Sequence, residues 1–138
     1  MHKPLPWLGL LFSLFATQAS AQVVVIVNPK SEVKLTAEQV ASLYMGRSTS
    51  LPGGISQPVD LPEANAAREQ FYSKAAGKTG AQVKATWARL AFSGKATPPK
   101  ELATAADIKK FVAANVDAIG YIDKSAVDSS VKVVVPLE

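Results

Sequence analysis

The sequence has 138 residues, a formal net charge of +4, no cysteine and a single histidine, His2. The absence of cysteine excludes disulfides, and the scattered basic residues lack the clustered stripe of nucleic-acid binders, so no nucleic-acid partner is expected. Once a leader that includes His2 is removed, the chain has neither thiol nor imidazole, which excludes a Ser-His-Asp triad, a Cys-His pair and the usual zinc sites, and we expect no metal or cofactor.

The first 21 residues have the layout of a secretory signal peptide. A basic start, His2-Lys3, is followed by the apolar run Leu5–Ala16 and the small residues Ala19–Ala21. We expect cleavage before Gln22, which makes residues 22–138 a single domain in the periplasm. A membrane anchor is the alternative, but the run is short for a span of roughly 20 apolar residues. A lipoprotein anchor is excluded because the chain has no cysteine.

Strand and helix patterns alternate after the leader. Val23–Val27 is a continuous β-branched run, which is typical of a strand buried on both faces of a parallel sheet. Thr36 is a good N-cap for a helix that ends near Gly46, and Pro58–Leu61 is a short strand.

Helical spacing returns in the second half of the chain. One helix carries Ala67 and Phe71 on one face and ends near Gly77, and the next begins at Gly80 and repeats apolar residues around Trp87. A helix over 104–115 and strands over 118–122 and 131–135 complete the pattern. This alternation predicts an α/β fold, a three-layer sandwich with a mainly parallel sheet and right-handed crossovers.

Four segments occur in an order that is similar to a known family: LTAEQVASLYMGR, REQFYSKAAGK, KATWARLAFSGK and IKKFVAANVDAIGYIDKSAVDSSVKVV. Together they resemble the periplasmic phosphate-binding proteins of ABC transporters, and in particular one lobe of that type II fold. The resemblance implies a non-enzymatic, solute-binding-like protein whose ligand is phosphate or another oxyanion. Full members trap the ligand between two lobes, so a stand-alone single lobe is expected to bind weakly or to have lost binding.

The resemblance also locates a candidate oxyanion site at the start of the second helix. The family has Gly-Ser-Gly-Thr there, with an Arg shortly before it. The matching positions here read Ala-Asn-Ala-Ala at 64–67, with Leu61 at the Arg position, so the hydroxyls and the Arg are absent. The candidate ligand-binding groups are then Asn65 as the helix cap, the N–H groups of Ala66, Ala67 and Arg68, and the Arg68 side chain.

A competing interpretation starts this helix at Pro62. Glu63 would then interact favourably with the helix dipole and repel an anion, and Arg68 would pair with a carboxylate on the surface.

The loop hydroxyls of Ser48, Thr49 and Ser50 are a second set of candidate ligands, because this loop borders the ligand cleft in the family. Solvated turn residues are the alternative. We expect Trp87 in the core rather than as a stacking platform, and the Tyr121 hydroxyl at the sheet edge.

An enzyme using paired carboxylates is disfavoured, since no acidic residue stands in an obviously apolar context. The alternative function is an interaction module that docks onto an envelope membrane protein, such as a sensor or transporter, without binding a ligand.

Overall fold

The computed structural model describes residues 22–137, so the predicted signal peptide lies outside the described residues. In this part of the chain, five strands form one sheet in the order β3-β2-β4-β1-β5. The strands are β1 (Val23–Val27), β2 (Gln57–Asp60), β3 (Lys100–Glu101), β4 (Ala118–Asp123) and β5 (Lys132–Pro136).

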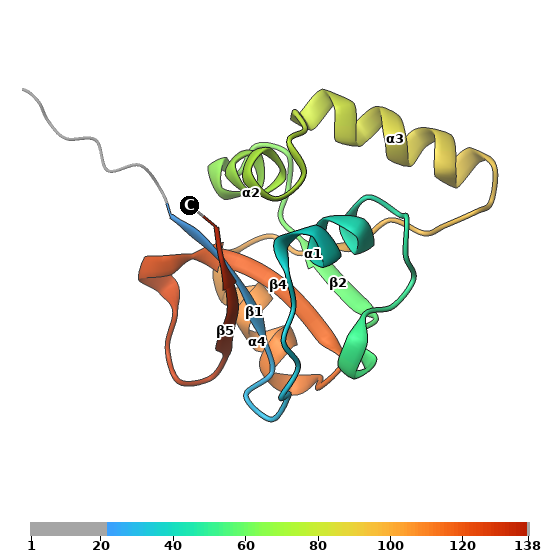
Figure 1. Cartoon of the computed structure of the whole chain (residues 1–138). Helices are drawn as coiled ribbons and strands as arrows, with labels where there is room; N and C mark the ends of the chain where they lie inside the picture. Colours follow the sequence, from blue (N-terminus) through green and yellow to red (C-terminus); the bar gives the residue numbers. More distant parts are fainter. Residues whose placement is uncertain (1–21, 138) are drawn as a thin grey trace, which may run out of the picture.

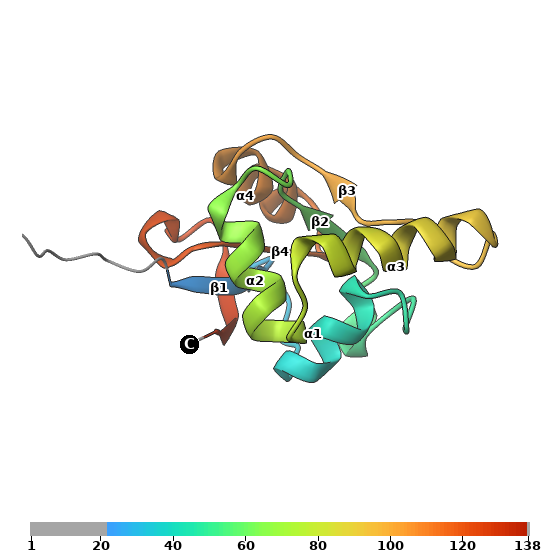
Figure 2. The same ribbon diagram turned by 90° about the horizontal axis from the view of Figure 1, so that it is seen from above.

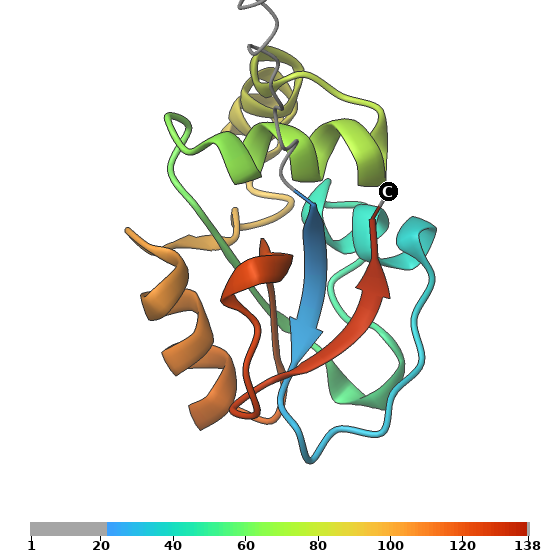
Figure 3. The ribbon, with the colours of Figure 1, turned by 90° about the vertical axis from the view of Figure 1, so that its left-hand side faces the viewer.

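The sheet is mixed, and four of its strands share one direction. β2 is parallel to β3 and β4, whereas β1 is antiparallel to both of its neighbours, β4 and β5. Figure 3 shows β1 and β5 pointing in opposite directions. All five residues of β1 are buried, as expected, but its placement among parallel strands was wrong, because the same apolar run suits either direction.

The helices begin at polar caps that satisfy their first N–H groups. They are α1 (Ala37–Tyr44), α2 (Ala66–Ala76), α3 (Gly80–Phe92) and α4 (Ala105–Ala114). The caps are Thr36, Asn65, Thr79 and Thr104, and two of them, Thr36 and Thr79, form complete capping boxes with a Gln three residues later.

The molecule has three layers, with the sheet between α4 on one face and α1 and α2 on the other (Figures 1 and 2). Consecutive residues of β4 show how the faces alternate. A Cβ at Gly120 would lie 2.7 Å from Ile108, so the glycine lets α4 approach closely. The next residue, Tyr121, points the other way and stacks on Phe71 of α2 with ring centroids 4.0 Å apart. The predicted three-layer α/β architecture is confirmed.

Helix α3 extends away from the rest of the molecule (Figure 2). Trp87 anchors it: the side chain is buried, and its indole N–H donates to the Tyr44 carbonyl at 2.8 Å. The core prediction for Trp87 is therefore confirmed. At the far end of α3, Phe92 is 95% exposed. No helix within residues 22–137 is both long and apolar enough to cross a membrane.

Candidate functional site

Helix α2 begins at Ala66, after the N-cap Asn65, and not at Pro62. The Asn65 side-chain oxygen accepts the Ala67 N–H at 2.9 Å, and the Asn65 carbonyl accepts the Arg68 N–H at 3.1 Å. Two of the three N–H groups that were predicted to face an anion thus have acceptors within the chain. The helix start is built as the Asn65 interpretation expected, but most of its donors are already engaged.

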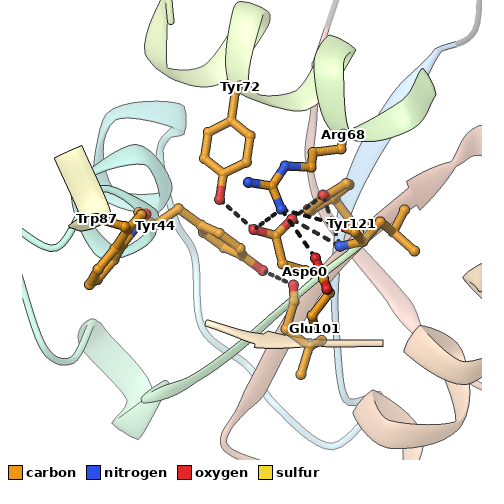
Figure 4. Close-up of polar contacts among 9 residues, drawn as sticks. Tyr44, Asp60, Arg68, Tyr72, Trp87, Glu101 and Tyr121 are labelled. Atoms are coloured by element: carbon orange, nitrogen blue, oxygen red, sulfur yellow. Dashed lines mark hydrogen bonds and ion pairs between the residues drawn. The ribbon is translucent and has the colours of Figure 1, made fainter. Parts of the chain in front are cut away.

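Arg68 turns back from α2 toward the end of β2 (Figure 4). Its Nη1 donates to the Leu61 carbonyl at 2.9 Å and lies 3.4 Å from Asp60 Oδ2 and 3.8 Å from Glu101 Oε2. The side chain is only 12% exposed. Arg68 therefore pairs with carboxylates, as the competing interpretation expected, but it does so in the interior and not on the surface.

Asp60 is the centre of this arrangement, and it is 3% exposed. Its Oδ2 accepts the Tyr72 hydroxyl at 2.6 Å, and its Oδ1 accepts the Leu61 N–H at 2.9 Å and the Tyr121 hydroxyl (Figure 4). Asp60 is therefore an acidic residue that is buried among hydrogen-bond donors. The prediction that the Tyr121 hydroxyl lies at the sheet edge was wrong, because β4 is the middle strand of the sheet and the hydroxyl is buried.

Strand alternation and helix placement bring these groups together. The Val59 side chain lies on the α4 face of the sheet, near Gly120. Because side chains alternate along a strand, the next residue, Asp60, points to the opposite face, where α2 lies. Tyr72 comes from α2 and Tyr121 from β4. Burial, followed by the charge of Asp60 and the hydrogen bond to it, raises the pKa of both hydroxyls well above the ordinary tyrosine value. Both tyrosines consequently remain protonated donors at neutral pH.

Tyr44 packs against the aromatic rings around Asp60, which are those of Phe71, Tyr72 and Tyr121. Its hydroxyl has one proton to donate and two carbonyl acceptors within reach, Val59 at 2.8 Å and Ile119 at 3.1 Å. Burial and then the Asp60 charge raise the pKa of Tyr44 well above its usual range. The ring packs edge-on against Phe71, with centroids 4.7 Å apart.

A pocket of about 510 Å³ opens beside this cluster, between α2, α3 and β3. Asp60 and Arg68 line it, and apolar side chains of α3 and three prolines form part of its wall. Its ionisable lining consists of three acidic residues and two basic ones, Asp60, Glu63, Glu101, Arg68 and Lys84. With one more acidic than basic group, this lining does not attract an anion.

The loop hydroxyls belong to a different part of the surface. Ser48 and Thr49 line a separate pocket of about 380 Å³, and the Ser48 hydroxyl lies 2.6 Å from that of Ser42. Ser50 is exposed. Trp87 lines both this pocket and the one beside Asp60, so it stands between them. The structure therefore does not bring the two predicted sets of ligand residues into one site.

Sequence reasoning missed Asp60 and its two tyrosine partners. The available signal was an acidic residue inside the apolar strand sequence PVDL, since a buried carboxylate needs hydrogen-bond donors. In the part of the chain that the structure describes, no three His, Cys, Asp or Glu side chains are placed to hold a metal ion.

No family model and no curated protein matches this chain. Several solved structures, however, are similar to it. A protein described as a phosphate ABC transporter substrate-binding protein from Clostridium perfringens, with bound phosphate, is 26% identical with a TM-score of 0.64 and matches 83% of this chain and 44% of its own. An ABC-type phosphate transport receptor from Vibrio cholerae is 21% identical with a TM-score of 0.63, over 83% of this chain and 45% of its own.

PstS from Borrelia burgdorferi is 11% identical with a TM-score of 0.60, over 83% of this chain and 47% of its own. The chain thus spans less than half the length of these structures. Two of the three likenesses lie below 25% identity and support the fold alone. The structural likeness agrees with the resemblance that the order of the four sequence segments indicated. The chain resembles a single lobe of the phosphate ABC transporter substrate-binding proteins.

Proposed function

We propose that this protein is an exported, non-enzymatic, solute-binding-like protein related to the phosphate substrate-binding proteins, with weak or lost oxyanion binding. The likeness to those proteins supports the first part of the proposal. The proposal of weak or lost oxyanion binding depends on one observation: the candidate ligand groups at the start of α2 already have partners within the chain. The Arg68 guanidinium, which would be the strongest ligand for phosphate, already contacts Asp60 and the Leu61 carbonyl.

A phosphate ion in this pocket would gain little. It would have to displace the Asp60–Arg68 contact and approach the carboxylates of Glu63 and Glu101, which also line the pocket. Each hydrogen bond that replaces one with water contributes only about 0.5–1.5 kcal/mol, and ordering the complex costs several kcal/mol. We therefore expect a dissociation constant for phosphate in the range of about 1 mM or weaker, near −4 kcal/mol.

Calorimetric titration of residues 22–138 with phosphate and sulfate tests this expectation. Glu63→Gln should strengthen any binding, because it removes a negative charge from the pocket, and Arg68→Ala should abolish it. Glu38→Gln is the matched control, since Glu38 lies in the first turn of α1 and is not among the residues that line the pocket. Micromolar phosphate binding by the unchanged protein would refute the proposal.

Export is tested on the full-length chain. Mass spectrometry of a periplasmic fraction should find a protein that starts at Gln22 and has lost residues 1–21. Recovery of the intact chain from the membrane fraction would contradict export as a cleaved protein.

The second candidate function is an interaction module that docks onto an envelope membrane protein, and the exposed end of α3 favours it. Phe92 is 95% exposed on a helix that extends from the molecule (Figure 1), and exposed aromatic side chains are enriched at interfaces. Affinity capture from solubilised envelopes should lose a specific partner with Phe92→Ser. It should keep that partner with Val116→Ser, a control residue that is 56% exposed. Equal capture by both variants would count against this candidate.

A further inference from the structure

We propose that the donors around Asp60 form a binding site for a small carboxylate anion, and that the Asp60 side chain is its permanent, covalently attached occupant. An occupied carboxylate site also accounts for the weak oxyanion binding proposed above, because Asp60 already engages the donors that an oxyanion would need. The test described below uses a different anion and a different variant, so that its result is independent of the phosphate titration.

The donors around Asp60 come from different parts of the chain. The two oxygens of Asp60 accept hydrogen bonds from the hydroxyls of Tyr72 and Tyr121 and from the Leu61 N–H, and Arg68 Nη1 lies 3.4 Å away. These groups come from α2, from β4 and from the backbone after β2 (Figure 4). Donors from three separate segments that converge on both oxygens of one carboxylate have the arrangement of an anion site.

Without the Asp60 carboxylate, these buried donors would have no acceptor. The Tyr72 and Tyr121 hydroxyls are buried and stay protonated, and the guanidinium of Arg68 carries a full positive charge with little exposure to water. Its Nε is already buried without a hydrogen-bond partner among the described residues. Buried donors that lose their acceptor carry a desolvation penalty, so the emptied site would favour any anion that restores the contacts.

The pocket gives a small anion access to the position of the Asp60 carboxylate. Asp60 lines the 510 Å³ pocket, so an anion that enters the pocket can reach the position of its carboxylate. Asp60→Gly removes the Cβ and the carboxylate group, which leaves room for formate, a planar carboxylate with three heavy atoms. Pivalate has the same charge and the same head group, but its three methyl groups are too bulky for the vacated space. In the unchanged protein the attached carboxylate excludes both anions.

The experiment measures the melting temperature of the Asp60→Gly protein by circular dichroism during titration with sodium formate or sodium pivalate. If formate binds with a dissociation constant of about 10 mM, 100 mM formate should raise the melting temperature by roughly 5 °C, in a saturable manner. Pivalate should produce less than about 1 °C. Two controls are the unchanged protein and the Asp128→Ala variant, which loses an exposed carboxylate and keeps Asp60. In both, formate and pivalate should change the melting temperature equally.

A second variant tests where the formate binds. Adding Tyr72→Phe to Asp60→Gly removes one donor and should weaken the apparent formate affinity by about tenfold or more. If Asp60→Gly is unfolded in buffer, the same titration should restore its helical signal in formate and not in pivalate. The inference is overturned if formate acts no more strongly than pivalate, if the Tyr72→Phe change has no effect on the formate response, or if formate fails to restore an unfolded variant.

Discussion

Raising the pH above 10 should unfold this protein, because all three of its tyrosines are buried. The chain contains only Tyr44, Tyr72 and Tyr121, and each is less than 2% exposed. Burial, together with the Asp60 charge, raises the pKa of each one in the folded protein above the ordinary value of about 10. The unfolded chain therefore loses these protons at lower pH than the folded protein does.

The sign and size follow from proton linkage. Above pH 10 the folded protein holds more protons than the unfolded chain, so the free energy of unfolding falls as the pH rises. Each tyrosine contributes about 1.4 kcal/mol per pH unit, and three contribute about 4 kcal/mol per pH unit. Integrated from pH 10 to 12, the loss is about 7 kcal/mol, because the unfolded tyrosines are only half ionised at pH 10. This loss is comparable to the whole stability of a domain of this size.

The assay records phenolate absorbance at 295 nm and far-ultraviolet circular dichroism together during alkaline titration. The three tyrosines should ionise in one steep step, near pH 12, that coincides with the loss of helix. Tyr72→Phe should reduce the pH dependence of stability by about a third. Phenolate formation with a midpoint near pH 10 in a protein that keeps its helical signal would refute the assigned burial of these hydroxyls.

Two substitutions test the packing beneath α3 by urea denaturation. Trp87→Ala should cost about 3–5 kcal/mol, because it empties a core position, whereas Phe92→Ala at an exposed position should change stability by less than about 0.5 kcal/mol. Equal effects would mean that α3 does not pack as described. Gly46→Ala should cost more than Gly77→Ala: both glycines have a positive φ, but only at Gly46 would the new Cβ clash, at 2.5 Å from a Leu90 methyl carbon. Equal costs for the two changes would contradict the close contact between Gly46 and Leu90.

Local signals predicted the helices well, because caps and apolar spacing lie within a few residues of each other. Thr36 and Thr104 cap helices at or next to the expected starts, Asn65 is one of the two starts considered for α2, and Gly77 ends α2 in the left-handed conformation. The direction of β1 could not be predicted, since a run of valines specifies burial on two faces but not the orientation of its neighbours.

The same distinction between local and long-range information explains the candidate site. The sequence around Asn65 indicated a possible cap there, although it also allowed a helix start at Pro62. The partners of Asp60 could not, because Tyr72 and Tyr121 lie 12 and 61 positions away along the chain. Two-residue strand β3 was missed for a similar reason: only its pairing with β2 makes it a strand.

The place of β1 in the sheet affects the order in which the sheet can form. β1 is the first strand along the described residues, but its hydrogen-bonding partners are β4 and β5, and Val23 pairs with Asp123, about 100 positions later. Contacts of such high sequence separation form slowly, because a long intervening loop has to be closed first. The apolar β1 segment therefore stays unpaired, and prone to aggregation, until both β4 and β5 have reached it.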